Sequence, residues 1–321
     1  MAILAAIGID VGGTKVEAAL VDAEGRLMAS VRLASRYGAE PREWLAQVTQ
    51  AVSELLQQAP KARLRGVGVG FAGQIDLATG TVLGSPNLGW RDVPLKAMLQ
   101  AALPVPVTVA NDVQAATWAE WKMGAGQGLS HLVCIFVGTG IGGGLVLDGK
   151  LYTGAAGSAG EIGHTVVDKD GPPCKCGGRG CLEALAGGWA IALRAQEAVR
   201  QSPGPGQRLL ALARGDPSMI TAATVSEAAH SGDAFAQGLV RQIGEDLGMG
   251  VASTVNAFNP EMVVLGGGVI EGMPELVGMA QAVVARQGLK SATASLIVTK
   301  AKLGNQAGVV GAALLALAAA G

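Results

Sequence analysis

Aromatic side chains are scarce in this sequence: Trp, Tyr and Phe together make up only 3% of its 321 residues. Charged residues are also few, at 15%, and the 24 basic and 25 acidic side chains are scattered, so the formal net charge is −1. Proteins that bind single-stranded nucleic acid rely on a basic groove and on aromatic stacking, and the sequence has neither a basic block nor a cluster of aromatic residues. The composition therefore predicts a protein with no nucleic-acid partner.

Long hydrophobic runs are missing as well. The one membrane-like stretch, residues 307–321, would span about 22 Å as a helix, which is less than the roughly 30 Å of a hydrocarbon core. The first seven residues are apolar, but they are too few for a secretory signal and carry no cationic leader. Half of all residues are hydrophobic. We therefore expect a globular, cytoplasmic protein with no membrane partner.

Cysteine is rare, with four in the chain, but three of them lie within eight residues. Without a secretory signal, such clustering favours a metal site over disulfides. Cys174, Cys176 and Cys181, together with His164, supply the four ligands of a closed tetrahedral zinc site. A redox cysteine cluster is the alternative, but it would not need a histidine and would show C-x-x-C spacing. The sequence therefore predicts one structural Zn²⁺ ion with no coordination position left for water.

The apolar pattern is typical of an α/β protein whose length exceeds that of a single core. We expect a first domain of residues 1–112, completed by a C-terminal helix 306–321, and a second domain of residues 113–305. Residues 201–215, which contain two prolines, are predicted to form a surface loop. The predicted strands cover residues 3–9, 16–21, 27–33, 67–71, 105–110, 132–137, 145–147, 262–265 and 296–299, and the predicted helices cover residues 41–59, 113–123, 233–258 and 307–321.

Three glycine-rich turns, at residues 10–15, 138–144 and 266–268, each follow an apolar strand directly. Backbone N–H groups in such turns can approach phosphate oxygens closely. One glycine turn alone is weak evidence, but three of them together favour a nucleotide. The first turn also carries Asp10, which could hold hydrated Mg²⁺, and Lys15, which could meet a phosphate. None of the turns matches the P-loop or the Rossmann fingerprint, so both of those folds are disfavoured.

Three carboxylates are candidates for contact with a substrate. Asp112 follows a predicted strand and precedes a predicted helix, so it is either a helix cap or a base that takes a proton from a substrate hydroxyl. Glu161 and Glu183 lie three residues before His164 and two residues after Cys181, so a zinc ion would hold them near each other. Carboxylates held rigidly are good acceptors for sugar hydroxyls, which favours a sugar as the substrate.

With these motifs in place, the chain resembles the ROK family (repressors, open reading frames and sugar kinases) of the actin-like ATPase superfamily over essentially its whole length. The most specific segments are Val137-Gly-Thr-Gly-Ile-Gly-Gly-Gly144, Gly160-Glu-Ile-Gly-His164 and Cys174-Lys-Cys-Gly-Gly-Arg-Gly-Cys-Leu-Glu183. The resemblance implies an α/β fold of the two-lobed actin-like ATPase (ribonuclease H-like) type with a zinc loop. It also implies an ATP-dependent hexose kinase that works as a homo-dimer or homo-tetramer and takes glucose as its preferred sugar.

The resemblance further implies roles for individual residues. Asp112 would be the catalytic base for the 6-hydroxyl of the hexose. The residues that would bind the sugar are Asn87, Asn111, Asp112, Glu161, His164 and Glu183. The residues that would bind ATP and its Mg²⁺ are Asp10, Gly12, Gly13, Thr14 and Lys15 in the first loop, Gly138, Thr139 and Gly140 in the second, and Gly266, Gly267 and Gly268 beside the adenosine. Zinc would be held by His164, Cys174, Cys176 and Cys181.

Departures from the family pattern bear on the choice of substrate. Many family kinases have Glu where this chain has Ala110, and Asn where it has Gln114. The turn Gly70-Phe-Ala-Gly73 also replaces a more usual Pro-Gly. The alternatives are therefore a kinase for N-acetylmannosamine, mannose or fructose, or a sugar-sensing regulator without enzymatic activity. Family regulators carry a helix-turn-helix before the first strand, and we expect no room for one before Ile3.

Overall fold

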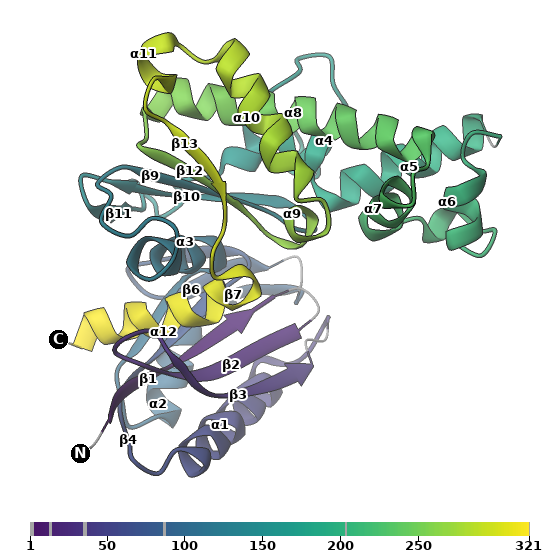
Figure 1. Cartoon of the computed structure of the whole chain (residues 1–321). Helices are drawn as coiled ribbons and strands as arrows, with labels where there is room; N and C mark the ends of the chain where they lie inside the picture. The colour runs from purple at the N-terminus through teal and green to yellow at the C-terminus, as the bar shows by residue number, and fades with distance from the viewer. Residues whose placement is uncertain (1–2, 13–14, 35–36, 86–87, 203, 321) are drawn as a thin grey trace. The chain divides into compact units, whose positions relative to one another are not determined.

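The computed structural model describes residues 3–12, 15–34, 37–85, 88–202 and 204–320. The chain folds into two compact units (Figure 1): the first comprises Met1–Gly128, Gly144–Gly160 and Asn305–Gly321, and the second comprises Leu129–Gly143 and Glu161–Gly304. The domain division expected from the sequence differs, because it places residues 113–128 and 144–160 in the second domain. That division into domains stays a prediction. Within the described part of the chain, no helix combines the length and apolar character that a membrane crossing requires.

A five-stranded sheet in the order β3-β2-β1-β4-β8 forms the centre of the first unit. Strands β1, β4 and β8 run parallel, so their carboxyl ends meet at one edge of the sheet. The register places Asp10 beside Gly70, and Gly70 beside Ala110. The first candidate site residues therefore gather at this edge. The strands are β1 (Ile3–Val11), β2 (Lys15–Asp22), β3 (Leu27–Ala34), β4 (Ala62–Phe71) and β8 (Val107–Asn111).

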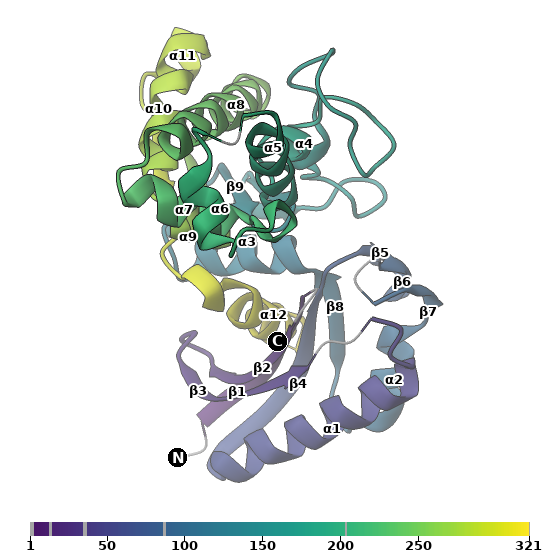
Figure 2. The same ribbon diagram turned by 90° about the vertical axis from the view of Figure 1, so that its right-hand side faces the viewer.

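Two helices cover opposite faces of this sheet, as Figure 2 shows. Because side chains alternate along a strand, Ile7 points to one face and Gly8 to the other. On the first face Ile7 packs in a buried cluster with the apolar side of α1 (Pro41–Gln58). On the second face α12 (Ala307–Ala320) lies against β1 and β4, directly over Gly8. The unit is completed by α2 (Leu95–Ala102), α3 (Asp112–Lys122) and a small sheet of β5 (Gln74–Asp76), β6 (Thr81–Ser85) and β7 (Trp90–Val93).

A second five-stranded sheet has the order β11-β10-β9-β12-β13. Its strand β12 pairs in parallel with both β9 and β13. The predicted strand at 145–147 is the second half of a longer strand, because residues 141–144, which the sequence assigned to the glycine turn, already belong to it. The strands are β9 (Leu132–Val137), β10 (Ile141–Leu147), β11 (Lys150–Tyr152), β12 (Met262–Gly266) and β13 (Ile297–Lys300).

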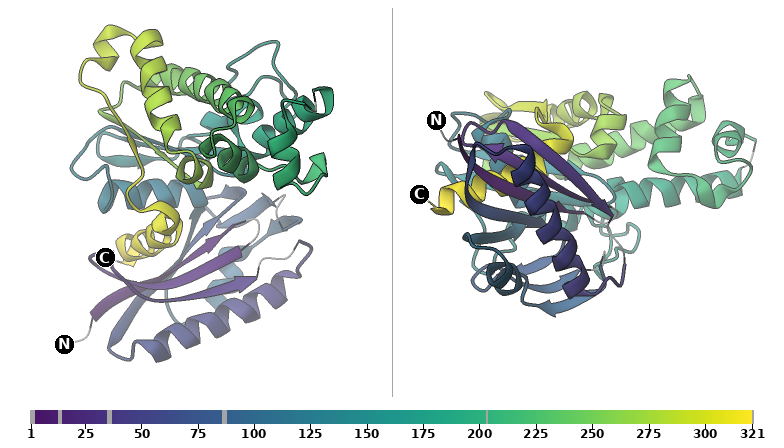
Figure 3. Two further views of the ribbon diagram at one scale, coloured as in Figure 1. Left: turned by 45° about the vertical axis from the view of Figure 1, so that its right-hand side comes forward. Right: turned by 90° about the horizontal axis from the view of Figure 1, so that it is seen from below.

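The longest helix of the second unit, α8 (Ala234–Phe258), packs side by side with α10 (Glu275–Gln287), as Figure 3 shows. The side chain of Asp233 caps α8 by accepting a hydrogen bond from the backbone N–H of Ala236, at 2.8 Å. The helix ends at Asn259, which adopts the left-handed conformation that commonly terminates helices. The other helices of the unit are α4 (Leu182–Ala186), α5 (Gly188–Gln201), α6 (Gln207–Leu212), α7 (Ala222–His230), α9 (Gly268–Gly272) and α11 (Lys290–Thr293), with short 3₁₀ turns η1 (Ile162–His164) and η2 (Pro217–Met219). A third 3₁₀ turn, η3 (Gly304–Gln306), lies where the chain passes back from the second unit to the first.

The prediction of a surface loop over the whole of residues 201–215 is wrong. This stretch contains helix α6, which follows the two prolines. Leu209 is completely buried, so the helix is stabilised by an apolar contact with the rest of the unit. The α/β class and the four predicted helices are confirmed, with ends that shift by one or two residues.

Candidate functional site

The first glycine turn lies at the carboxyl end of β1. Within it, the backbone N–H of Gly12 donates to the carbonyl oxygen of Lys15 at 3.0 Å. The Lys15 ammonium lies 3.5 Å from a carboxylate oxygen of Glu17. Burial, followed by the nearby charge of Asp112, raises the pKa of Asp10 to about 7. Asp10 is thus a carboxyl group that a divalent cation would readily deprotonate. Gly13 and Thr14 lie outside the described residues.

Asn111 and Asp112 lie where β8 passes into α3. The Asn111 side-chain oxygen accepts hydrogen bonds from the backbone N–H groups of Val113 and Gln114, at 2.9 and 3.1 Å. Asn111 is therefore the N-cap of α3, and Asp112 is its first residue. The interpretation of Asp112 as the helix cap is wrong, because its neighbour fills that role. The role of Asp112 as a base stays a prediction.

Gln114, on the first turn of α3, links this helix to the loop before Glu161. Its side-chain amide donates to the carbonyl oxygen of Gly157 at 2.8 Å. Its side-chain oxygen is buried and has no hydrogen-bond partner among the described residues. The sequence marked Gln114 only as a departure from the family, and the structure shows what it contacts.

The segment from Ser85 to Trp90 contains Asn87, which the sequence predicts to contact the sugar. Asn87 lies outside the described residues. The two ends of the segment pair with each other across β6 and β7, Ser85 with Trp90. The Trp90 indole donates to the carbonyl oxygen of Ala39 at 2.7 Å, and Ser85 is buried. Both ends of the segment are thus anchored in the first unit.

In the second unit, one cysteine-histidine cluster gathers all four predicted zinc ligands. The ligand atoms of His164, Cys174, Cys176 and Cys181 all lie within 4.8 Å of one another. The sulfur atoms of Cys176 and Cys181 are 3.7 Å apart, and His164 Nδ1 is 3.7 Å from the sulfur of Cys174. A tetrahedral ion with Zn–S bonds of about 2.3 Å requires S···S separations of about 3.8 Å. The cluster therefore has the dimensions of a zinc site.

The protonation behaviour of the thiols fits the same interpretation. Burial raises the pKa of Cys174, and burial together with the neighbouring thiols raises the pKa of Cys181 to about 12. The backbone N–H of Gly178 lowers the pKa of the exposed Cys176. Three thiolates cannot share so small a space without a cation, and a bound zinc ion would supply the positive charge that ionises them. The cluster is compatible with a structural zinc ion.

Glu183 lies two residues after the last cysteine, on the short helix α4, and both of its carboxylate oxygens accept hydrogen bonds. One oxygen accepts from the backbone N–H of Ile141 at 2.9 Å, and the other accepts from the indole N–H of Trp189 at 3.1 Å. Glu161 is exposed and lies just before the 3₁₀ turn that carries His164. His164 turns Nδ1 toward the cysteines, which leaves Nε2 on the opposite side of the ring for another partner.

The second glycine loop is held against the start of α5. The carbonyl oxygens of Gly138 and Thr139 accept hydrogen bonds from the backbone N–H groups of Gly188 and Trp189, at 2.9 and 3.0 Å. A Cβ atom at Gly140 would overlap the carboxylate of Glu183. A side chain at this position would therefore have to displace the Glu183 carboxylate from its hydrogen bond with Ile141.

The third glycine loop connects β12 to α9. Gly267 has a φ of +90°, which favours glycine, and a Cβ atom there would lie 2.5 Å from the carbonyl oxygen of Val137. By contrast, a Cβ atom at Gly268 would meet nothing within 4 Å. The loop thus combines a turn that requires glycine at position 267 with open space beside Gly268.

Known proteins that are similar to this chain identify its family. The model of the ROK family matches residues 6–319. The chain belongs to the ROK family. It is 35% identical to a glucokinase of Streptomyces coelicolor over 97% of this chain and 96% of that protein. It is 34% identical to an N-acetylmannosamine kinase of Escherichia coli over 97% of each chain.

A solved ROK structure shows the same fold. The glucokinase of Streptomyces griseus, in complex with glucose and AMPPNP, superposes with a TM-score of 0.81 and is 34% identical, over 98% of this chain and 99% of that chain. The α/β architecture with two five-stranded sheets is thus that of the ROK sugar kinases, as the resemblance in sequence implies.

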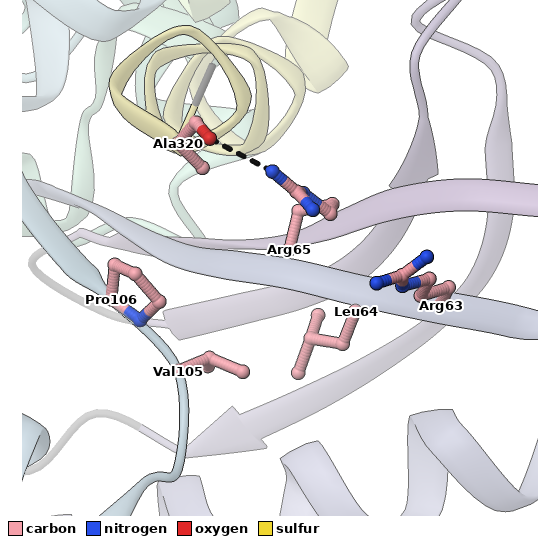
Figure 4. A pocket seen from close by; sticks show the side chains of 6 residues that line it. All are labelled: Arg63, Leu64, Arg65, Val105, Pro106 and Ala320. Carbon is pink, nitrogen blue, oxygen red and sulfur yellow. Dashed lines mark hydrogen bonds between the residues drawn. The ribbon is translucent and has the colours of Figure 1, made fainter.

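One surface pocket of the first unit holds none of the predicted site residues (Figure 4). It lies at the end of α12, where Arg65 donates a hydrogen bond to the carbonyl oxygen of Ala320 at 2.9 Å. A cation at this position stabilises the carboxyl end of a helix. This contact gives Arg65 a structural role at the end of α12. Its lining consists of Arg63, Leu64, Arg65, Val105, Pro106 and Ala320.

Proposed function

We propose that this protein is an ATP-dependent glucokinase, which transfers the γ-phosphoryl group of ATP to the 6-hydroxyl of glucose. The observation that carries the proposal is the similarity to glucokinases over nearly the whole chain, including the structural similarity to one that was solved with glucose and an ATP analogue. The carboxylate of Asp112 at the start of α3 supports its assignment as the base, because Asn111 and not Asp112 caps the helix.

In the proposed reaction, Asp112 accepts the proton of the 6-hydroxyl as that oxygen attacks the γ-phosphorus. The bond between the γ-phosphorus and the oxygen that bridges to the β-phosphate breaks, and ADP leaves with the electron pair. Mg²⁺, when bound near Asp10, would neutralise charge on the phosphates. The backbone amides of the three glycine loops would bind phosphate and adenosine. This division of roles depends mostly on positioning and electrostatics, as in other phosphoryl transfers.

The proposed sugar contacts come from Asn87, Asn111, Glu161, His164 and Glu183. The 2-hydroxyl of glucose can donate to a carboxylate such as Glu183, whereas the axial N-acetyl group of N-acetylmannosamine needs more space and different hydrogen-bond partners. A site built for hydroxyls rejects a poorly matched analogue by orders of magnitude, because buried polar groups are left unpaired. Ala110, smaller than the usual Glu, leaves room nearby that would favour tolerance of a second hexose.

A coupled assay of ADP release over glucose, mannose, fructose and N-acetylmannosamine tests the proposal. We expect the highest kcat/KM with glucose and glucose 6-phosphate as the product. A higher kcat/KM with one of the other sugars would reassign the substrate. N-acetylmannosamine is the most informative of them, because the chain is also similar to a kinase for that sugar. Hexose binding without any hexose-dependent ADP release would identify a regulator instead. The expected homo-dimer or homo-tetramer stays a prediction that light scattering can check.

A further inference from the structure

Trp189 occupies the second position of α5 and is only partly exposed. Its indole N–H donates to one carboxylate oxygen of Glu183, while the backbone N–H of Ile141 donates to the other. A glutamate side chain has several rotamers, and two charge-assisted hydrogen bonds on opposite oxygens select one of them. Each oxygen keeps a lone pair, so the carboxylate can still accept a hydrogen bond from a further hydroxyl.

The other contacts of Trp189 lead to the cysteine-histidine cluster. Its ring packs against the buried group of Cys174, Cys181 and Ala184. The ammonium of Lys175, which lies between two of the cysteines in sequence, sits 4.7 Å from the centre of the indole ring, within the range of a cation–π contact. One ring thus touches both the cysteine loop and the carboxylate of Glu183.

The backbone of Trp189 is anchored independently of its side chain. Its N–H donates to the carbonyl oxygen of Thr139, in the second glycine loop. Substitution of the side chain leaves this hydrogen bond in place, so the indole contacts can be removed without removing the tie between α5 and the glycine loop.

We propose that Trp189 is a positioning residue, through which the cysteine-histidine loop holds Glu183 in the orientation that accepts a sugar hydroxyl. This inference rests on the proposed function, because it takes Glu183 as a sugar ligand. Trp189 itself does not touch the substrate and acts through Glu183. A sugar ligand held by only one of its two hydrogen bonds spends part of its time in other rotamers, which weakens sugar binding.

The variant Trp189→Phe tests this proposal, because it removes the indole N–H and retains an aromatic ring next to Lys175. We expect the KM for glucose to rise about tenfold, the effect of losing one hydrogen bond to a charged group. The KM for ATP and the zinc content should stay at the wild-type values. The matched control is Trp118→Phe, in which the ring packs on Trp121 and on Lys122. We expect this control to keep the wild-type KM for both substrates.

The double variant with Glu183→Gln distinguishes action through Glu183 from a separate effect. If Trp189 acts through that carboxylate, adding Trp189→Phe to Glu183→Gln changes the KM for glucose less than twofold. An unchanged KM in Trp189→Phe, or effects of the two substitutions that multiply, would overturn the proposal. If the wild-type protein prefers another hexose, only the proposed substrate is overturned. The KM values of the single and double variants are then compared for that hexose. Normal sugar affinity in Glu183→Gln would remove Glu183 as a ligand and overturn the inference about Trp189 with it.

Discussion

Asn111 and Asp112 are adjacent in the sequence but have different environments. Asn111 uses its side-chain oxygen to cap α3, which satisfies two backbone N–H groups that the helix would otherwise leave unpaired. Asp112 is the first residue of the helix, where a negative charge is favoured by the helix dipole. The structural role of Asn111 thus lies directly beside the chemical role that we propose for Asp112.

The variant Asp112→Asn should lose phosphoryl transfer and keep its fold. Asparagine has nearly the same size but cannot accept a proton, so we expect kcat to fall by a factor of roughly 10²–10⁴. Glucose binding, measured by calorimetry, should change by less than a few-fold. The control Asn111→Ala should instead lower the free energy of unfolding by about 1 kcal/mol, through loss of the cap. Turnover of Asp112→Asn within a few-fold of wild type would contradict the role of base.

Asp10 makes a pH-dependent contribution to stability. Its pKa of about 7 in the folded protein exceeds the ordinary value of 3.8, so the folded state keeps a proton that the unfolded state has lost. Asp10 therefore makes the free energy of unfolding decrease as the pH rises from about 4 to about 7, and it adds no further change above that range.

The variant Asp10→Asn removes this dependence. The free energy of unfolding is measured in urea without added Mg²⁺ for the variant and for wild type. The difference, variant minus wild type, should be about 2 kcal/mol larger at pH 8 than at pH 5. The variant should also need more Mg²⁺ for activity, since the carboxylate that we propose as a ligand is lost. An equal difference in stability at both pH values would show that Asp10 titrates normally in the folded protein.

At the scale of elements, α12 approaches the first sheet closely because glycines line its path. A Cβ atom at Gly8 would overlap the carbonyl oxygen of Val309, and a Cβ atom at Gly68 would overlap that of Ala312. Both clashes are with backbone, which cannot move aside as a flexible side chain can. The close packing of α12 on β1 and β4 therefore depends on these two positions.

The variant Gly68→Ala should be strongly destabilised, by about 3 kcal/mol, because the added methyl group forces the helix away from the sheet. Thermal or urea unfolding measures the loss. The matched control is Gly84→Ala, also in a strand of the first unit, where a Cβ atom would meet nothing within 4 Å. We expect that control to change stability by less than about 0.5 kcal/mol. Equal effects of the two substitutions would show that α12 can shift without cost.

At the scale of the whole molecule, the cysteine-histidine cluster joins three segments that follow one another along the chain. It lies among the turn that carries His164, the cysteine loop and the start of the helix that carries Glu183. A metal ion that binds only the folded arrangement contributes its binding free energy to folding. We therefore expect the metal to support both stability and sugar binding.

Protein purified without added zinc should contain about one zinc ion per chain, as metal analysis can establish. The variant Cys176→Ser should lose the metal and most of its activity, because Glu161, His164 and Glu183 lose their common anchor. The control Cys134→Ala changes a cysteine buried in β9 and should keep the zinc. Full activity in a protein free of metal would contradict a structural zinc ion.

Local sequence determined much of this protein. The spacing of four metal ligands and the glycine turns after apolar strands predicted a cluster and loops that the structure contains. These features are readable because they depend on residues close together in the chain. A ligand spacing or a turn conformation is a property of a few consecutive residues, whatever the rest of the molecule does.

Tertiary structure decided the rest. It raised the pKa of Asp10 by burial and placed the indole of Trp189 on Glu183. It also turned part of a predicted loop into α6, because Leu209 found an apolar environment. Each of these outcomes depends on atoms that packing brings together, such as a neighbouring strand or a facing helix. Local spacing cannot encode them, because the free energy of each contact is set by the partner and by how far water is excluded.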